Sequence, residues 1–272
     1  MTRLTEVMLR AVNLGSFDKE VQCKTGRTIC QLAAEVAGLP EPLPTRRQRL
    51  FAVIPVSAGQ GIVKGFVEQV EAVLVYLGLT VKKIAETDVA GLAQAALAGA
   101  DIVFCADDSL FMALNLKNGT CIDNATATAE MYVHATSLMA NGMSAKKTLL
   151  LGLGKVGEAC LVASLNRGAD LWVYDLSAEK TRKKAREYGV IPVEQRLAHV
   201  CREAEIIIDA SPGEGFIPEN WLSDGVVIGA PGLPLGLQAQ HLSRFQDRMI
   251  HDCLVLGVAG MAAMSLAQGG PE

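Results

Sequence analysis

Three closely spaced glycines are the residues with the clearest chemistry in this chain. Gly152, Gly154 and Gly157 follow the apolar run 147–151, which predicts a buried strand, a tight turn and then a helix. In that arrangement Gly152 permits the turn, Gly154 lets a pyrophosphate approach the backbone, and Gly157 allows the helix to pack closely on the sheet. The N-terminus of the helix offers free N–H groups and a partial positive charge to the phosphates. The sequence therefore predicts a dinucleotide-binding segment made of Gly152, Leu153, Gly154, Lys155, Val156 and Gly157.

An acid at the end of the next predicted strand indicates which dinucleotide is preferred. Asp175 follows the apolar run 171–174, where a carboxylate accepts hydrogen bonds from a ribose diol and repels a 2′-phosphate. The basic run from Lys180 to Lys184 would favour NADP, but it lies inside the next predicted helix. We interpret that run as a solvated helix face and expect NAD as the cofactor.

Two later turns are expected to complete the cofactor site. In an open parallel sheet, ligands gather beyond the carboxyl ends of the strands. The turn that carries Ser211 and Pro212 would lie over the ribose and adenine. The next turn would lie near the nicotinamide and contributes Ala230, Pro231 and Gly232. Each proline–glycine pair is also compatible with a simple turn.

Acidic residues follow apolar segments in both halves of the chain and are candidates for binding a cation. Asp107 and Asp108 end a predicted strand, and we expect one of them to cap its turn and the other, Asp107, to face the cleft. Asp252 also follows an apolar segment, although a helix cap or a surface acid is the slightly simpler interpretation. Two carboxylates in one cleft would suit a cationic, amine-bearing substrate. Lys117, the one basic residue near this rim, is interpreted as a solvated loop lysine.

Composition excludes several other functions. Half of the 272 residues are hydrophobic and the formal net charge is −4, so we expect a folded chain without the basic surface that nucleic acid requires. No charge-free apolar run is long enough to span a membrane, and the N-terminus lacks the apolar core of a signal peptide. The seven cysteines and four histidines show no metal-ligand spacing. These features predict a cytoplasmic protein with reduced thiols, no metal, no membrane or nucleic-acid partner, and a small-molecule substrate.

The first half of the chain is predicted to be helical and then α/β. Residues 1 to about 38 contain an amphipathic helix that stops at Gly38, and a proline-rich connector follows. Alternating strands and helices then predict a parallel α/β unit. We expect its strands at 50–56, 80–84 and 101–106, its helices at 62–77 and 89–97, and a long helix from Asn124 or Thr126 to Met139.

The second half is predicted to be a Rossmann domain. We expect its strands near 147–151, 170–174, 205–209, 226–230 and 249–251, and a last helix at about 259–267 that packs back on the first domain. The fold class is therefore α/β, with a C-terminal Rossmann NAD-binding domain and an N-terminal α/β domain preceded by a helical segment. We interpret residues 1–140 as the helical segment with the substrate-binding domain, and 141–272 as the dinucleotide-binding domain.

Two further motifs resemble those of the PylD family of pyrrolysine biosynthesis proteins. The first is IPVSAGQGI at 54–62, and the more distinctive second is ADDSLF at 106–111 followed by NLKNG at 115–119. The glycine segment 152–157 is similar to the cofactor loop of the family, which many dehydrogenases share. The resemblance runs in order over nearly the whole chain, from Leu4 to the C-terminal helix.

The resemblance implies an NAD-dependent enzyme that completes pyrrolysine biosynthesis. The substrate would be L-lysine-Nε-(3R)-3-methyl-D-ornithine, whose ornithine side-chain amine is oxidised by hydride transfer to NAD⁺. Hydrolysis of the imine gives a semialdehyde and ammonia, and the α-amine of the same ornithine closes the pyrroline ring. The homodimer common for this architecture is also expected.

The resemblance also implies which residues contact the substrate. Asp107 and Asp252 are the candidate catalytic residues, and we expect Asp107 to hold and deprotonate the amine with Asp252 assisting. Ala58 and Asp252 stand where the family can have a serine and a glutamate, so Asp252 is one methylene shorter than that acid. The substrate-binding positions are Leu4, Ser57, Ala58, Asp107, Asn124 and Asp252.

Two other functions stay open from the residues alone. The first is another two-domain NAD-dependent amino-acid dehydrogenase, which would oxidise a different amine. The second is a non-catalytic NAD-binding sensor, which would bind the cofactor and turn over no amine.

Overall fold

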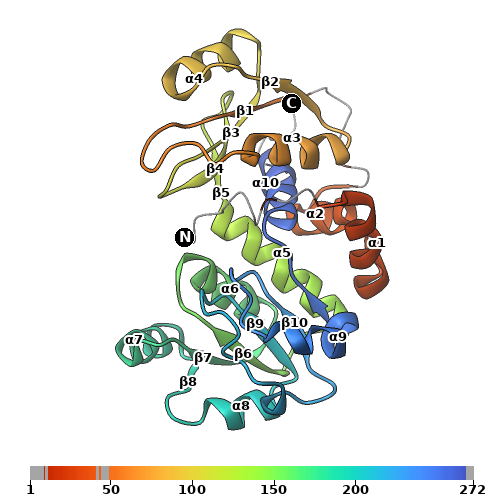
Figure 1. The fold of residues 1–272 in the computed structure, drawn as a ribbon, viewed down its shortest axis with the longest axis vertical. Coiled ribbons are helices and arrows are strands. Elements are labelled where there is room, and N and C mark those ends of the chain that lie inside the picture. Colours follow the sequence, from red (N-terminus) through yellow and green to blue (C-terminus); the bar gives the residue numbers. More distant parts are fainter. Residues whose placement is uncertain (1–8, 10–11, 41–42, 44–48, 268–272) are drawn as a thin grey trace.

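The protein has two α/β parts, one above the other along the long axis of the molecule (Figure 1). The computed structural model describes residue 9, residues 12–40, residue 43 and residues 49–267. The upper part is the N-terminal domain and holds a five-stranded sheet. The lower part is the cofactor domain and holds a six-stranded sheet. The α/β fold class predicted from the sequence is confirmed.

The N-terminal domain begins with two helices and continues as a mixed sheet. Its strand order is β2-β1-β3-β4-β5, with β1 parallel to β2 and β3, and with β4 antiparallel to both β3 and β5. Its elements are α1 (Leu14–Thr25), α2 (Ile29–Ala37), β1 (Leu50–Ile54), α3 (Phe66–Tyr76), β2 (Thr80–Lys83), α4 (Asp88–Leu97), β3 (Ile102–Ala106), β4 (Phe111–Asn115), β5 (Cys121–Asp123) and α5 (Asn124–Met139).

The cofactor domain is a parallel sheet of the order β11-β10-β9-β6-β7-β8. The strand order reverses between β6 and β9, as in doubly wound nucleotide-binding sheets. Its elements are β6 (Lys147–Leu151), α6 (Lys155–Asn166), β7 (Asp170–Tyr174), α7 (Ala178–Tyr188), β8 (Ile191–Pro192), α8 (Leu197–Glu203), β9 (Ile206–Asp209), η1 (Glu219–Trp221), β10 (Val227–Gly229), η2 (Ala239–His241), α9 (Leu242–Phe245), η3 (Gln246–Arg248), β11 (Met249–Ile250) and α10 (Val255–Ala267).

Local capping explains several helix boundaries. The Thr28 side chain accepts a hydrogen bond from the Gln31 N–H, and the Gln31 side chain accepts one from the Thr28 N–H, which is a capping box at the start of α2. Gly38, with φ of 64°, ends that helix in the left-handed conformation. Helix α5 spans Asn124–Met139 and ends where we expected, but Asp123 is its N-cap and Asn124 its first residue.

Three features of the predicted elements are wrong. Residues 111–123 form the antiparallel strands β4 and β5, where we expected only loops and turns. Helix α3 begins at Phe66, because residues before Gly65 form a loop held by side chains of neighbouring segments. Helix α10 begins at Val255, because the side chain of Asp252 caps its first turn.

Helices α5 and α10 join the two parts. Helix α5 packs on α2 of the N-terminal domain, on α10, and on α6 and β10 of the cofactor domain. Helix α10 leaves the cofactor sheet and packs on α2, α3 and α5. Its inner face is buried almost throughout, and Gly257 and Gly260 allow its close contact with α5. The position of α5 and α10 between the sheets is visible in Figure 1.

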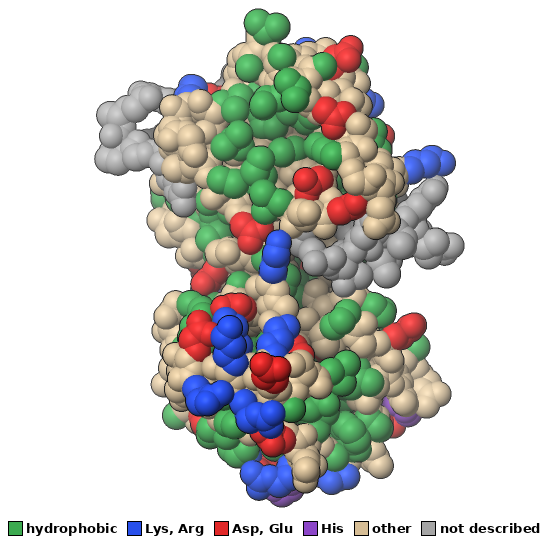
Figure 2. Space-filling model, turned by 90° about the vertical axis from the view of Figure 1, so that its left-hand side faces the viewer, with side chains coloured by type: hydrophobic (Ala, Val, Ile, Leu, Met, Phe, Trp, Pro, Cys, Tyr) green, Lys and Arg blue, Asp and Glu red, His purple; other side chains and the backbone are tan. Residues whose placement is uncertain are grey.

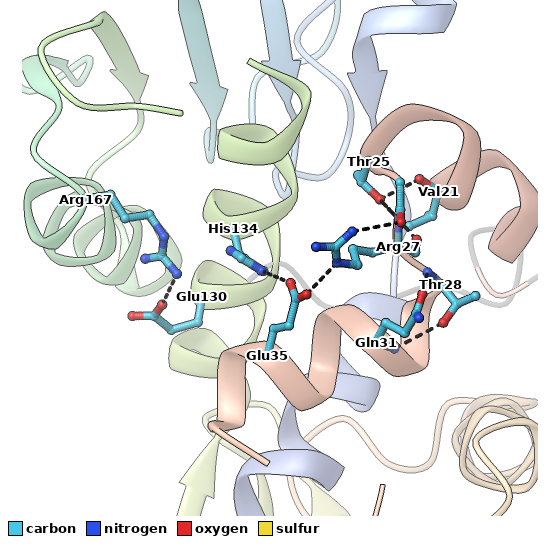
Figure 3. A network of polar contacts seen from close by, with 10 residues as sticks. Val21, Thr25, Arg27, Thr28, Gln31, Glu35, Glu130, His134 and Arg167 are labelled. Atoms are coloured by element: carbon cyan, nitrogen blue, oxygen red, sulfur yellow. Dashed lines mark hydrogen bonds and ion pairs between the residues drawn. The ribbon is translucent and has the colours of Figure 1, made fainter. Parts of the chain in front are cut away.

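A chain of ion pairs fixes α2 to α5 and α5 to α6 (Figure 3). The Glu35 carboxylate lies between the Arg27 guanidinium and the His134 ring, whose Nε2 is 2.7 Å from Glu35 Oε2. One turn earlier on α5, Glu130 pairs with Arg167 of α6 at 2.9 Å. Burial alone would raise the pKa of Glu35, but Arg27 and His134 together hold it below its ordinary value. These pairs brace the side of the molecule where the two domains are packed together.

No helix of the described residues has the length and apolar character needed to cross a membrane.

The α5–α10 contact predicts a stability effect. A side chain at Gly260 would meet the side chain of Met131 within 2.7 Å and the Ala127 carbonyl oxygen within 3.1 Å. We expect Gly260→Leu to lower the free energy of unfolding in urea by about 1–3 kcal/mol, because the added atoms overpack a closed helix contact. The matched control is Ala96→Leu on the exposed face of α4, which should change it by less than about 0.5 kcal/mol. Equal effects of the two variants would contradict the tight contact.

Candidate active site

The candidate active site is a cavity of about 780 Å³ that both domains line. It lies beyond the carboxyl ends of strands from both sheets, where open α/β sheets bind ligands. Figure 2 shows the narrow waist between the two lobes on one face of the molecule. The residues on its walls that matter below are Asp107, Asn124, Thr128, Tyr132, Gly152, Gly154, Lys155, Asp175, Lys180, Ser211, Pro212, Pro231, Gly232, Asp252 and Gly257.

The glycine segment has the geometry that a pyrophosphate site needs. Gly152 has φ of 84°, and a Cβ there would lie 2.8 Å from the backbone of Ser211. A Cβ on Gly157 would lie 2.0 Å from the Gly152 carbonyl oxygen, so only glycine permits this approach of helix and turn. A Cβ on Gly154 would meet nothing within 4 Å. Gly154 therefore leaves open space at the N-terminus of α6, where an anion can approach the backbone.

Asp175 ties the glycine segment to the start of α7. Its Oδ2 accepts a hydrogen bond from the Leu153 N–H at 2.8 Å, and its Oδ1 accepts one from the Ser177 N–H at 3.0 Å. Burial would raise the pKa of Asp175, but these bonds and the nearby Lys180 ammonium bring it below its ordinary value. The carboxylate is therefore ionised at neutral pH and lines the cavity at the end of β7.

The interpretation of the basic run as a solvated helix face is wrong for its first member. The Lys180 ammonium lies 3.2 Å from Asp175 Oδ2, and the side chain lines the cavity. It faces inward because it stands in the first turn of α7, directly above the end of β7. Arg182 and Lys184 pair instead with Glu194 and Glu158.

A buried aspartate holds together the two turns beyond β9 and β10. Asp209 Oδ1 accepts hydrogen bonds from the backbone N–H and hydroxyl of Ser211, and Oδ2 accepts one from the Gly236 N–H at 2.9 Å. Burial raises the pKa of Asp209 in spite of these donors. The bonds fix the turns, which place Ser211, Pro212, Pro231 and Gly232 on the cavity wall.

Ala230 lies beneath this wall and does not line the cavity. Its side chain is fully buried, because the residue directly follows the buried strand β10. Its carbonyl oxygen is 2.8 Å from Nδ1 of His251. Leu153 is buried as well and meets the site through its backbone N–H only, while Gly157 serves the packing of α6.

The two acids after β3 both cap turns, contrary to the division of roles we expected. Asp107 Oδ1 accepts hydrogen bonds from the N–H groups of Ser109 and Leu110, at 2.7 and 2.8 Å. Asp108 Oδ2 accepts one from the Gln60 N–H at 2.7 Å and thereby holds the neighbouring loop. Both residues line the cavity, and the exposed carboxylate of Asp107 has no hydrogen bond from a described residue to its Oδ2. The two backbone donors lower the pKa of Asp107, and Lys155 adds to this effect.

Asp252 is a helix cap that also lines the cavity. Its Oδ1 accepts hydrogen bonds from the N–H groups of Leu254 and Val255 at the start of α10. Its Oδ2 is 3.0 Å from the Tyr132 hydroxyl, which in turn accepts a 2.7 Å bond from the Asp252 N–H. Burial raises the pKa of Asp252 more than these donors lower it. The two candidate acids therefore differ, with Asp107 the weaker base and Asp252 the stronger.

One face of α5 supplies polar groups that the sequence interpretation only partly found. Asn124, Thr128 and Tyr132 are spaced four residues apart, lie on one side of the helix and line the cavity. Thr128 Oγ1 is 3.3 Å from Asn124 Oδ1. Asn124 was expected in the site, whereas Thr128 and Tyr132 were missed. The four-residue spacing from Asn124 was the signal that would have found them.

Four predicted positions fall outside the cavity wall or the described residues. The Ser57 hydroxyl donates a 2.5 Å hydrogen bond to Asp88, and Ser57 and Ala58 lie in the loop beside the cavity lining. Leu4 lies outside the residues that the structure describes. Lys117 pairs with Asp101 at the end of the sheet where β3 begins and β4 ends, opposite the end that faces the cavity, so its placement near this rim is wrong.

Within the described ranges, no group of three or more His, Cys, Asp or Glu side chains could hold a metal ion. The seven cysteines are free thiols.

Sequence comparison identifies relatives of this chain. Residues 9–122 match the family described as pyrrolysine biosynthesis protein PylD, N-terminal domain. The chain is 32% identical to a pyrrolysine synthase of Methanosarcina acetivorans over 77% of this chain and 79% of that protein. It is 30% identical to a pyrrolysine synthase of Methanosarcina barkeri over 77% of this chain and 78% of that protein.

Solved structures of similar fold include dehydrogenases. Shikimate dehydrogenase from Aquifex aeolicus is 18% identical, with a TM-score of 0.54 over 82% of this chain and 93% of that chain. Quinate dehydrogenase from Corynebacterium glutamicum, solved in complex with NAD, is 14% identical, with a TM-score of 0.53 over 82% of this chain and 94% of that chain. At these identities the likeness establishes the fold.

Substitutions at Gly154 and Gly157 are predicted to affect cofactor binding and stability separately. We expect Gly154→Ala to leave thermal unfolding unchanged, because its Cβ meets nothing in the protein, and to weaken dinucleotide binding about tenfold or more by blocking the phosphates. We expect Gly157→Ala to lower the free energy of unfolding by about 1–3 kcal/mol, because its Cβ collides with the Gly152 carbonyl. Calorimetry with NAD⁺ and thermal unfolding measure the two effects. Undiminished dinucleotide binding by Gly154→Ala would contradict the assignment of the phosphate site.

Proposed function

This chain belongs to the pyrrolysine synthase family, and from that premise we propose that it catalyses the NAD-dependent oxidation and cyclisation that forms pyrrolysine. The substrate is L-lysine-Nε-(3R)-3-methyl-D-ornithine, a dipeptide-like amine. The observation that carries the proposal is the cavity in which two carboxylates, Asp107 and Asp252, line the same space as the glycine turn of a dinucleotide-binding domain. A cationic amine and a dinucleotide can therefore meet there.

The residues of the cofactor domain fit a dinucleotide. Gly154 leaves room beside the N-terminus of α6, and Asp175 offers an ionised carboxylate at the end of β7 for a ribose diol. Ser211, Pro212, Pro231 and Gly232 form the wall toward which the rest of the cofactor would extend. When bound, NAD⁺ supplies the hydride acceptor for the carbon that bears the ornithine side-chain amine.

The two acids have different tasks in the proposed reaction. An ammonium group has no lone pair to support hydride loss, so its proton must leave first. Asp107, whose pKa is lowered by backbone donors, stays ionised and holds the ammonium. Asp252, whose pKa is raised by burial, is the better proton acceptor. This assigns the deprotonation chiefly to Asp252, whereas the sequence alone favoured Asp107.

The steps after oxidation need less help from the protein. Water adds to the imine and ammonia leaves, which gives a semialdehyde. The α-amine of the same ornithine then attacks the aldehyde, and loss of water gives the pyrroline ring. Both groups belong to one molecule, so their effective concentration is already high. The protein has only to hold the substrate so that its α-amine stays close to its aldehyde.

The direct test combines purified protein, NAD⁺ and the lysine–methylornithine dipeptide. We expect NADH absorbance to grow and a product of pyrrolysine mass to appear with release of ammonia. NAD binding by calorimetry with turnover only on another amino acid would indicate a different amino-acid dehydrogenase. NAD binding without turnover of any amine would indicate a sensor.

Exchange of each acid for its amide predicts distinct kinetic defects. We expect Asp107→Asn to raise KM for the dipeptide about tenfold or more, because it removes the charge that holds the ammonium. We expect Asp252→Asn to lower kcat about 100-fold and to abolish the acidic limb of the pH profile, since activity rises with pH as the acceptor loses its proton. Glu130→Gln, at the α5–α6 ion pair away from the cavity, is the control. Full turnover by both site variants would contradict these roles.

Asp175 predicts the choice of cofactor. Its carboxylate would repel a 2′-phosphate, and Lys180 only partly offsets its charge. We expect kcat/KM to be at least about tenfold higher with NAD⁺ than with NADP⁺. Asp175→Asn should reduce this ratio and Lys180→Met should increase it. A wild-type preference for NADP⁺ would overturn the assignment.

A further inference from the structure

Lys155 joins the two walls of the active-site cavity. It is the first residue of α6 and directly follows Gly154 of the phosphate turn. Its ammonium nitrogen donates a 2.9 Å hydrogen bond to the carbonyl oxygen of Ser109, which belongs to the N-terminal domain. Both Lys155 and the neighbouring Asp107 line the cavity. A cofactor-domain side chain therefore crosses to the wall that carries the proposed amine-binding acid.

The Lys155 bond reaches a turn that is closed by hydrogen bonds of its own. Ser109 and Leu110 donate their N–H groups to Asp107 Oδ1, and the Asp107 N–H donates to the Leu110 carbonyl at 2.9 Å. A displacement of the Ser109 carbonyl therefore also displaces the Asp107 carboxylate, because both belong to one hydrogen-bonded turn. The Lys155 charge also acts on Asp107 directly, because it favours the ionised carboxyl.

The position of Lys155 in the first turn of α6 is electrostatically unfavourable for the helix itself. A cation in the first turn of a helix is opposed by the positive end of the helix dipole. The Ser109 carbonyl and the Asp107 carboxylate supply the negative partners that offset this repulsion. Lys155 is exposed, so no packing holds its side chain and its hydrogen bond can break if the two domains separate.

We propose that Lys155 is a positioning residue that couples the two ligands of the site. Its ammonium holds the Asp107 turn against the cofactor domain, so a bound dinucleotide and a bound amine each strengthen the binding of the other. The opposite side of the molecule is braced by α5, so the domains can approach or separate at this mouth while remaining packed at their back. Because coupling between two sites is reciprocal, the same factor must appear in both affinities. The proposal rests on the dipeptide substrate proposed above.

The first experiment measures that factor by calorimetry. The Kd of the dipeptide is determined with and without saturating NADH, which binds without turnover, in wild type and in Lys155→Met, Lys155→Arg and Lys183→Met. In wild type we expect the dipeptide to bind about tenfold more tightly with NADH present. Lys155→Met should reduce this gain to less than about twofold, and Lys155→Arg should restore part of it, because the guanidinium still donates to a carbonyl. Lys183 is exposed on α7 outside the cavity lining, so its variant should keep the full gain.

The alternative role of Lys155 is to bind the phosphates alone. It predicts that Lys155→Met weakens NADH binding about tenfold in the absence of dipeptide and leaves the coupling factor intact, and that result would overturn the proposal.

A second measurement does not need the dipeptide. Hydrogen–deuterium exchange of the Ser109 and Leu110 amides reports whether the turn is tethered, and we expect several-fold faster exchange in Lys155→Met than in wild type or Lys183→Met. Equal exchange would overturn the tether whatever the substrate is. If the dipeptide fails to bind wild type while the exchange differs as expected, the proposed substrate fails and the tether stands.

Discussion

The contact between α5 and α10 is the constraint on which the site depends. Asp252 caps the first turn of α10 and Asn124 is the first residue of α5, so the packing of the two helices fixes the distance between these side chains. The contact is closed to the point that a Cβ on Gly257 would lie 2.7 Å from Asn124 Oδ1. The same two helices carry the packing between the domains. The same two helices therefore line the cavity and hold the domains together, so a shift at one of these contacts displaces the other.

The carboxylates of the site also hold its backbone. Asp107, Asp175, Asp209 and Asp252 each accept hydrogen bonds from backbone N–H groups at the end of a strand or the start of a helix. Their surroundings, however, set their basicity apart. Exposed Asp107 keeps a low pKa because its backbone donors outweigh its slight burial, whereas burial dominates at Asp252. Two chemically identical groups with similar capping geometry thus acquire unequal proton affinities because their burial differs. Acid–base chemistry requires such a difference.

The sequence predicts the parts of this fold that depend on local chemistry. The glycine turn, Asp175 and the capping box of α2 follow from residue types at fixed spacings, because each serves a contact within a few residues. Strand β4 escaped prediction because its apolar run is short and its pairing with β3 is a tertiary contact. The spacing from Asn124 would have placed Tyr132 on the cavity face, but only the position of α10 gives its hydroxyl the partner Asp252. The homodimer and the cytoplasmic location expected from the sequence stay predictions.

Three helix N-termini converge on the cavity, those of α5, α6 and α10, through Asn124, Gly154 and the residues next to Asp252. Each contributes a partial positive charge. This potential favours a pyrophosphate and opposes an ammonium, so the carboxylates of Asp107 and Asp252 are needed to admit a cationic amine at all. The same potential favours the neutral amine once it is bound, because it disfavours the extra proton. In the proposed reaction the neutral amine is the form that can release hydride. The arrangement that binds the dinucleotide therefore also biases the substrate toward its reactive state, and the two acids determine how strongly.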